Sequence, residues 1–376
     1  MPGTIPKVTW PQALAWRMER HLLEPIGNRT VADVVRRLCG VQAQVASSAE
    51  LAIRLRRQSS RPGEVARALA DGRLVKTWAM RGALHLLTPE EGGAFLSLFA
   101  DARPWARPVW VRHFGLTPGG IERLRQAVRD ELDGKVLTRE ELVAAVVKRR
   151  GLANVAEALG SGWGTLLKPL AWQGDLCFGP SRGNRVTFML PESASSRWAG
   201  LPDPEEGAGI AVRAYLGAYG PANADAFGAW LSGGWFGKRK LRGMFAALGD
   251  EVAEVEVDGE RAFILARDLD ALASAKPTHT VRLRGGFDQW VLGPGTDDGH
   301  VTPAKRRREV SKQSGWISPV VVAGGVVCGT WERIGDVVAI AWFKEAGPIP
   351  RHDLQPEVAR LSTIVDRELR PTFRRA

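Results

Sequence analysis

The sequence predicts an α+β fold, in which three successive helical modules each end in a β-hairpin and a strand-rich part follows. One observation behind this prediction is that a pattern of three amphipathic helices and a hairpin recurs along the chain. A second is that strand-like runs and glycine turns replace the helical periodicity after about residue 276. With 376 residues the chain is long for a single core, so several packed modules are expected.

The first module is expected within residues 1–100. Helix-periodic segments follow one another there, and a short helix leads into two strand-like runs. Capping and turn residues mark the boundaries: Pro11, Thr30 and either Ser47 or Ser48 at helix starts, Gly40 at a helix end, and Arg81-Gly82 between the strands.

The second module is expected at residues 101–190. Thr138 and Glu141 have the spacing of a capping box, which predicts that a helix begins at this threonine. Residues 175–190 have the pattern of two strands joined by a glycine-rich tip.

A linker rich in Pro, Ser and Gly is expected at 191–203. The third module follows at 204–275, with three helical segments and then a hairpin. Asp258-Gly259 marks the turn of that hairpin, because this dipeptide favours the two-residue turns that join antiparallel strands.

Helices followed by a hairpin are typical of the winged helix, a variant of the helix-turn-helix. Its second or third helix usually enters a DNA groove, and its hairpin contacts the backbone or the minor groove. Three tandem winged-helix motifs in a basic chain favour DNA binding. The alternative is that the three modules bind other proteins.

Residues 276–376 are expected to form a small β-barrel with a closing helix. Gly324-Gly325 and Gly335-Asp336 resemble hairpin turns between strand-like runs. The closing helix is expected at 353–370, with its apolar residues turned inward.

Composition limits the classes of protein that are possible. The net charge of +11 and the pI of about 10.0 favour a polyanionic partner. Arg greatly outnumbers Lys and Ala is abundant, so a GC-rich genome is an alternative origin of the charge. No run of 18 apolar residues and no signal-peptide pattern occurs, so no membrane association and a cytoplasmic, nucleoid-associated location are expected.

The sequence contains no motif that is typical of a metal or cofactor site. The three cysteines and six histidines show no metal-ligand spacing, and no phosphate-binding GxxxxGK[ST] motif occurs. No cofactor and no metal are therefore expected, and the cysteines are interpreted as buried thiols. No lysine stands in an obvious Schiff-base context, so no lyase step is expected.

Gln42 and Gln44 flank one alanine just after Gly40. On a helix these two side chains would diverge, whereas on an extended segment they share one face. Two neutral amides could then converge on a small target such as a water or a base edge. The alternative from spacing alone is that they cap helix ends or bond to loop backbone.

Several stretches together resemble the AlkZ-like family, which are bacterial DNA glycosylases with tandem winged helices. They are GVQAQVASSAELAIRLR, TWAMRGALHLL, LCFGPSRGNRVTF, GWFGKRKLRG and SGWISPVVVAGGVVCGTW, in the order of that family. The family is linked to azinomycin resistance and to unhooking of interstrand crosslinks. The resemblance implies that Gln42 and Gln44 are the catalytic glutamine–aliphatic–glutamine motif, at the centre of a C-shaped, basic DNA channel. It also implies a helper hairpin, for which 293–300 is the candidate.

Uncharged glutamines suit one class of leaving group. An N7-alkylguanine is already cationic and leaves as a neutral base, so no general acid is needed. Placing a water beside C1′ remains to be done, and an amide pair can do this by hydrogen bonding. A monofunctional glycosylase for cationic adducts and crosslinks in double-stranded DNA is therefore expected. Glu50, Asp297 and Asp298 are possible assisting carboxylates, with an ordinary surface or turn role as the alternative.

Two basic runs are candidate phosphate contacts. Helix N-termini and basic side chains suit phosphates. The first run is Lys238, Arg239 and Lys240, at the start of a recognition-type helix, and the second is Lys305, Arg306, Arg307 and Arg308. DNA contact is favoured for the first run, and a solvated face is an equal alternative for the second.

The competing functional hypothesis is a winged-helix DNA-binding protein without catalysis, either a regulator or a resistance protein that sequesters a drug. Regulators usually dimerise on palindromic sites. Three unlike modules in one chain favour a monomer that clamps DNA.

Overall fold

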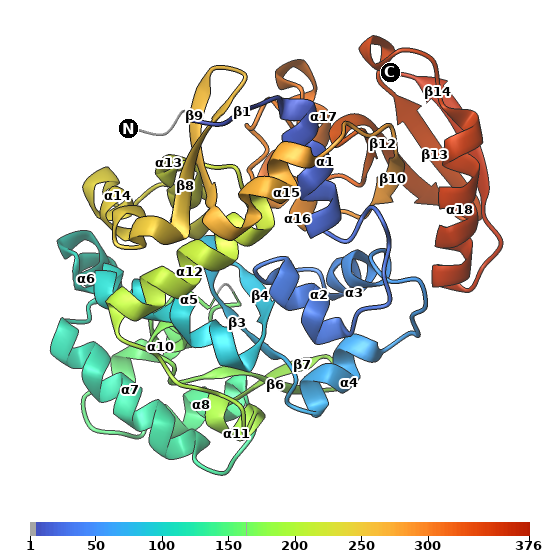
Figure 1. The fold of residues 1–376 in the computed structure, drawn as a ribbon. Coiled ribbons are helices and arrows are strands. Elements are labelled where there is room, and N and C mark those ends of the chain that lie inside the picture. The colour runs from blue at the N-terminus through green and yellow to red at the C-terminus, as the bar shows by residue number, and fades with distance from the viewer. Residues whose placement is uncertain (1–4, 163) are drawn as a thin grey trace. The chain divides into compact units, whose positions relative to one another are not determined.

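The computed structural model describes residues 5–162 and 164–376, and these residues form two compact units. The first unit consists of the described residues up to Glu64 together with Val212–Ala376, and the second unit is Val65–Ala211. Figure 1 shows the first unit as the blue, yellow and red parts of the chain and the second mainly as the cyan and green parts.

Three helices open the first unit: α1 (Trp10–Arg20), α2 (Val31–Arg37) and α3 (Ala46–Arg54). Thr30 caps α2 as predicted, because its hydroxyl accepts a hydrogen bond from the Asp33 amide. The predicted cap of α3 is wrong. That helix begins after Val45 without a side-chain cap, so Ser47 and Ser48 lie inside its first turn.

The third predicted module has the expected order of elements. Its helices are α12 (Pro204–Tyr219), α13 (Ala224–Ser232) and α14 (Lys238–Ala246), and its hairpin is β8 (Val252–Val257) with β9 (Glu260–Leu265). Asp258 and Gly259 both have positive φ, at 47° and 90°, which suits a two-residue hairpin turn. The short β1 (Lys7–Val8) pairs in parallel with β8, and α15 (Leu269–Ser274) follows the hairpin.

The C-terminal sheet is open, so the predicted β-barrel is wrong. Its strands are hydrogen-bonded in the order β10 (Val281–Arg284), β11 (Val320–Ala323), β12 (Val326–Ile334), β13 (Val337–Trp342) and β14 (Arg370–Arg375). Both predicted glycine turns join neighbouring strands. Strand β14 was not expected, and it pairs in parallel with β13.

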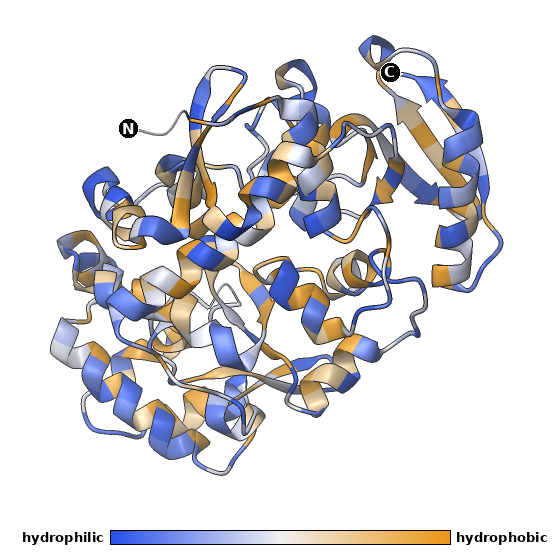
Figure 2. Cartoon of the chain, in the orientation of Figure 1, coloured by the Kyte–Doolittle hydropathy of each residue, from blue (hydrophilic) through white to orange (hydrophobic). Residues whose placement is uncertain are grey.

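Helices cover the two faces of this sheet, which is why the sheet need not close on itself. On one face α18 (Arg351–Val365) contributes Leu354, Val358 and Leu361 to an apolar cluster. On the other face the short helix α16 (Gln289–Leu292) packs with α1 around Trp290. In Figure 2 hydrophobic colour marks much of β13, whereas β14 at the edge of the sheet is mainly hydrophilic. The helix α17 (Arg307–Val310) completes this part.

Helices of the second unit accompany a sheet whose strands pair in antiparallel fashion. The strands are hydrogen-bonded in the order β4 (Leu84–Leu87), β3 (Val75–Trp78), β6 (Cys177–Arg182), β7 (Arg185–Met189) and β5 (Leu137–Thr138). The helices are α4 (Glu64–Ala70, which starts at the unit boundary), α5 (Pro89–Ala102), α6 (Pro108–Phe114), α7 (Pro118–Leu132), α8 (Arg139–Val146), α9 (Ala156–Gly160), α10 (Lys168–Trp172) and α11 (Pro191–Ala194).

The predicted local signals of the second unit are confirmed. Thr138 and Glu141 form the capping box of α8, and both predicted hairpins are present. The expected linker is packed: the Ser195 hydroxyl donates to the Gly72 carbonyl at 2.6 Å. A Cβ atom on Gly93 would lie 1.7 Å from the Gly200 carbonyl oxygen, so this approach requires glycine.

The α+β fold class is confirmed, whereas the assignment of three winged helices remains a prediction. The compact units cut across the first predicted module, since α1–α3 belong to the first unit and β3–β4 to the second. In the described part of the chain, no helix is both long and apolar enough to cross a membrane.

Candidate functional site

A sharp turn at the end of α2 directs the chain into the segment that carries the two glutamines. Cys39 and Gly40 have positive φ, at 57° and 92°, and the Gly40 amide donates to the Val35 carbonyl at 2.9 Å. This geometry ends a helix and satisfies its last carbonyl groups. The helix end predicted at Gly40 is thereby confirmed, and the chain continues into β2 (Val41–Gln42).

Gln42 ends β2 and Gln44 lies in a bend before α3, so the segment is non-helical, as predicted. Val41 is 0% exposed and Ala43 is 2% exposed, whereas Gln42 is half-buried and Gln44 is exposed. This alternation has the period of two that extended backbone produces. Both glutamines are therefore accessible on either side of the buried Ala43, and helix begins again only at Ala46.

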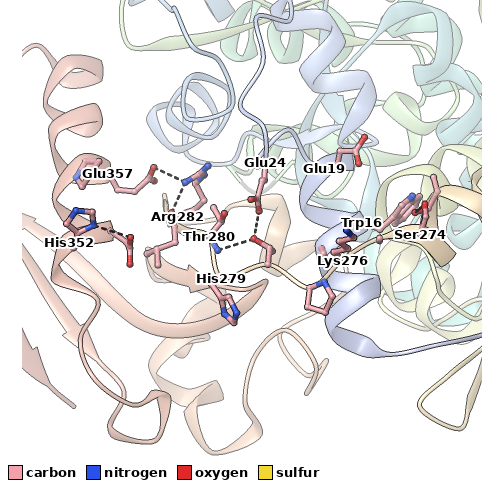
Figure 3. A pocket seen from close by; sticks show the side chains of 18 residues that line it. Trp16, Glu19, Glu24, Ser274, Lys276, His279, Thr280, Arg282, His352 and Glu357 are labelled. Atoms are coloured by element: carbon pink, nitrogen blue, oxygen red, sulfur yellow. Dashed lines mark hydrogen bonds and ion pairs between the residues drawn. The ribbon is translucent and has the colours of Figure 1, made fainter.

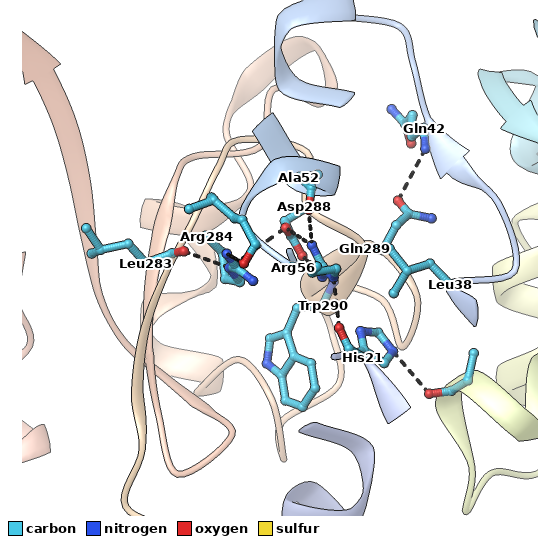
Figure 4. A network of polar contacts seen from close by, with 12 residues as sticks. His21, Leu38, Gln42, Ala52, Arg56, Leu283, Arg284, Asp288, Gln289 and Trp290 are labelled. Atoms are coloured by element: carbon cyan, nitrogen blue, oxygen red, sulfur yellow. Dashed lines mark hydrogen bonds and ion pairs between the residues drawn. The ribbon is translucent and has the colours of Figure 1, made fainter. Parts of the chain in front are cut away.

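The buried side chain of Gln289 bonds to the backbone of this segment (Figure 4). Its Nε2 donates to the Gly40 carbonyl oxygen at 3.0 Å, and its Oε1 accepts from the Gln42 amide at 3.5 Å. Gln289 is the first residue of α16 and is 0% exposed. Residues that are 249 positions apart in the chain thus meet at the glutamine motif.

A buried ion pair anchors the start of α16. Asp288 caps the helix by accepting from the Trp290 amide at 2.8 Å. Its carboxylate also accepts two hydrogen bonds from Arg56, which donates further to the carbonyl groups of Ala52 and His21. The end of α1, the end of α3 and the start of α16 are therefore tied together behind the glutamines.

The pKa values of the buried ionisable groups around Arg56 are shifted from their usual ranges. Burial alone would raise the pKa of Asp288, but the adjacent Arg56 holds it down to about 2. Burial lowers the pKa of Arg284 to about 9, and the pKa of His21 well below its usual range. The Asp288 carboxylate therefore stays charged at neutral pH.

Lys238, Arg239 and Lys240 lie where they were predicted, at the exposed start of α14. Buried Leu241, Met244 and Phe245 hold the opposite face of the helix. Lys238 is 3.2 Å from Asp225 in an exposed ion pair, and the Lys240 ammonium lies over the Phe236 ring.

In the second basic run, residues 305–308, one side chain forms ion pairs and the other three are exposed. Arg306 bonds to Glu345 through two nitrogens, to Glu309 and to the Ala376 carbonyl, and its guanidinium stacks over Phe343. These contacts hold the Arg306 guanidinium in ion pairs within the first unit. Lys305, Arg307 and Arg308 are exposed on the same short helical stretch.

Two of the three candidate carboxylates, Glu50 and Asp298, have structural contacts. Glu50 accepts a hydrogen bond from the Gly63 amide at 3.0 Å. Asp298 accepts from the His300 amide at 2.9 Å, and its carbonyl oxygen closes the turn to Val301 and Thr302. Residues 293–300 form a loop of turns and no strands, so the hairpin expected there is wrong.

Three cavities lie in the described part of the first unit outside the glutamine motif, and one of them, of about 350 Å³, is lined by Asp297 and Asp298. The cavity in Figure 3, of about 960 Å³, is lined by polar side chains that bond to one another, including Arg282 with Glu357 and Thr278 with Glu24. A cavity of about 380 Å³ adjoins the first turn of α3, where Ser47 and Ser48 face Trp316 and Trp331.

Metal ligands do not gather in the described residues: no three side chains of His, Cys, Asp or Glu there could hold one ion. Cys39 and Cys177 are buried and Cys328 is half-buried. Burial raises the pKa of the Cys177 thiol and raises that of Cys328 to about 11, which disfavours the reactive thiolate.

Sequence reasoning missed Gln289, Asp288 and Arg56. The segment around Gln289 looked strand-like, whereas it is a single helical turn. Asp288 directly before the apolar run of Trp290 was a usable signal, because Asp is a preferred N-cap. The pairing with Arg56 had no signal in the sequence.

Comparisons with known proteins agree closely with one another. Residues 35–363 match the sequence model of a family described as DNA glycosylase AlkZ-like. The chain is 47% identical over 357 residues to an interstrand DNA cross-link repair glycosylase of Streptomyces sahachiroi, covering 95% of this chain and 96% of that protein. The solved structure of the DNA glycosylase AlkZ of that organism is similar with a TM-score of 0.95 and 45% identity, over 98% of this chain and 100% of that chain.

Proposed function

The chain belongs to the AlkZ-like family of DNA glycosylases, and we propose that it excises cationic N7-alkylguanine and unhooks interstrand crosslinks by adding water at C1′. The observation that supports the proposed site is that Gln42 and Gln44 are both accessible on a non-helical segment whose intervening Ala43 is buried. Family membership decides against a DNA-binding protein without catalysis.

Gln42 and Gln44 are proposed to hold the attacking water. Each amide both donates and accepts, so two of them can orient a water without a change of charge. Cleavage of the N-glycosidic bond passes through an oxocarbenium-like state, and a fixed water next to C1′ captures it and releases one proton to the solvent. Because the alkylated base leaves neutral, no proton donor is required, whereas a normal base would need one.

The surroundings of the motif support a mechanism without a carboxylate. Asp288 lies behind the segment, but its two oxygens are engaged by Arg56 and the Trp290 amide. A neutral pair gives selectivity through the leaving group, so the enzyme need not enclose a flipped base in a tight pocket. Bulky adducts and crosslinks could not enter such a pocket.

Double-stranded DNA is proposed to contact the exposed start of α14. Lys238, Arg239 and Lys240 present three positive charges at a helix N-terminus, which suits phosphate groups. Lys305, Arg307 and Arg308 are a second proposed contact, and Arg306 is left out because of its internal ion pairs. We further propose that the protein acts as a monomer on nucleoid DNA in the cytoplasm, without cofactor or lyase step.

Crosslinks are included among the substrates because the S. sahachiroi relative is an interstrand DNA cross-link repair glycosylase. The test is release of free 7-methylguanine from a methylated duplex, together with conversion of a crosslinked duplex to separable strands. Both are expected with the wild-type protein and neither with buffer alone. A shift of the DNA in a gel without any released base would overturn the proposal.

A further inference from the structure

We infer that Gln289 is a positioning residue: its side-chain amide fixes the backbone at 40–42 and thereby aims the Gln42 side chain at the water. The inference rests on the proposed function in one respect, since it takes Gln42 as a group that holds the water. The inference adds Gln289, from the C-terminal part of the chain, to the proposed catalytic site.

The first step is the geometry of the two hydrogen bonds. In extended backbone the carbonyl of one residue and the amide two residues later point to the same edge. Gln289 bonds to this pair, the Gly40 carbonyl at 3.0 Å and the Gln42 amide at 3.5 Å. Its side chain therefore takes the place that a peptide group of a neighbouring strand would occupy.

The second step is the consequence for the Gln42 side chain. Side chains of a strand stand roughly perpendicular to the direction of its edge hydrogen bonds. Fixing the edge at Gly40 and Gln42 therefore fixes the face on which the Gln42 amide lies. The left-handed turn at Cys39 and Gly40 directly precedes this segment, so the two hydrogen bonds of Gln289 hold the backbone where the chain changes direction.

The third step is that Gln289 itself is held rigidly. It is 0% exposed, and the Asp288 cap bonded to Arg56 fixes the backbone on one side. On the other side the buried Trp290 indole donates to the Gly325 carbonyl at 3.0 Å. Only an amide can donate to one backbone group and accept from the other at this length, so methionine or glutamate cannot replace both bonds.

The test is a double-mutant cycle on single-turnover excision of 7-methylguanine from duplex DNA. Gln289→Met has a similar length and lacks both hydrogen bonds. We expect it to lower the excision rate by about 10-fold or more while affinity for the same duplex stays within about 2-fold, since misplacement of a catalytic group slows the chemical step. In a Gln42→Ala background we expect Gln289→Met to have no further effect.

Gln12→Met is the matched control. Gln12 also joins two backbone segments of the first unit: its Oε1 accepts from the Thr9 amide at 2.9 Å and its Nε2 donates to the Ala275 carbonyl at 3.3 Å. Gln12 does not bond to the segment that carries Gln42 and Gln44, so its replacement should leave the excision rate unchanged. Rates are compared at a temperature well below the melting of every variant.

The outcomes separate the inference from the proposed function. An equal fold-loss from Gln289→Met with Gln42 present and with Gln42→Ala would make Gln289 merely structural and overturn the inference alone. Full activity of Gln42→Ala would overturn the proposed catalytic role, and the inference with it. If Gln289→Met does not fold, Gln289→Glu replaces it in the cycle, because it keeps the acceptor and loses the donor to Gly40.

Discussion

The Arg56 guanidinium donates two hydrogen bonds, at 2.7 and 2.6 Å, to the carboxylate of Asp288, and both side chains are 0% exposed. The two residues are 232 positions apart. Their pair joins the end of α3 to the start of α16, the two elements on either side of the glutamine segment. Stability of the fold and geometry of the site therefore depend on the same contact.

Asp288→Asn should destabilise the protein strongly. Removing one partner of a buried pair leaves the other charge uncompensated, which costs on the order of 3–5 kcal/mol. Asp225→Asn is the control, because Asp225 and Lys238 form an exposed pair worth about 1 kcal/mol or less. Thermal unfolding of the two variants should show a large fall in Tm for the first only. Equal falls would contradict the role given to the buried pair.

The same pair should make stability depend on pH in acid. The pKa of Asp288 is about 2 in the folded protein, below its ordinary value of about 4. A lowered pKa stabilises the fold above the ordinary value, and this contribution is lost as pH falls toward 2. The difference in Tm between wild type and Asp288→Asn should therefore be full at pH 5 and shrink between about pH 4 and pH 2. A difference that stays constant across this range would contradict the assignment.

Gln42→Ala and Gln44→Ala should each lower excision far more than binding. Phosphate contacts elsewhere supply most of the affinity, whereas loss of a group that places the water costs on the order of 100-fold in rate. Single-turnover excision and affinity are measured on the same methylated duplex. Parallel losses of both quantities would mean that the glutamines serve the structure only.

Local signals in the sequence predicted much of the fold, and long-range contacts account for what they missed. Thr30 and Thr138 cap helices and Asp258-Gly259 forms a hairpin turn, because short-range hydrogen bonds and φ preferences determine these features. The non-helical segment at Gln42 and Gln44 followed from spacing and from Gly40 in the same way. The edge of the open sheet is β14, which pairs with β13 although α18 separates the two strands in the sequence. No local pattern specifies β13 as the partner of β14.

The candidate site was predictable only in its exposed half. A period of two and an unusual pair of amides marked Gln42 and Gln44. Gln289 lies in a helical turn of four residues, which is too short for a periodic signal. Its partner Gly40 is 249 positions away, a distance over which sequence spacing carries no information.

Lys238, Arg239 and Lys240 should contribute to the salt dependence of DNA binding. Each phosphate contact that is lost reduces the slope of log affinity against log salt by about 0.9. The triple alanine variant should therefore have a slope lower by about 2 to 3, measured on unmodified duplex. Arg306→Ala is the control and should leave the slope unchanged, since its guanidinium is held by Glu345 and Glu309. An unchanged slope in the triple variant would mean that this run is a solvated face.

Excision should depend on neither a metal ion nor a group that titrates near neutral pH. The proposed amide pair carries no charge, and the described residues offer no group of three metal ligands. Excision of 7-methylguanine should therefore survive a chelator and show no acidic limb between about pH 5 and 7. Asp288 does not titrate in this range, because its pKa is about 2, and burial holds the pKa of His21 well below its usual range.

A limb in that range would reveal an assisting acid and contradict the neutral mechanism. Glu50, Asp297 and Asp298 would be replaced in turn by their amides, and the responsible variant would lose both the activity and the limb. Ionic strength must be constant, because a change in DNA affinity could imitate a catalytic pKa. A reaction without enzyme at each pH is subtracted, since the cationic base also leaves spontaneously. Loss of excision on chelation would contradict the mechanism more directly, because an uncharged amide pair has no use for a metal ion.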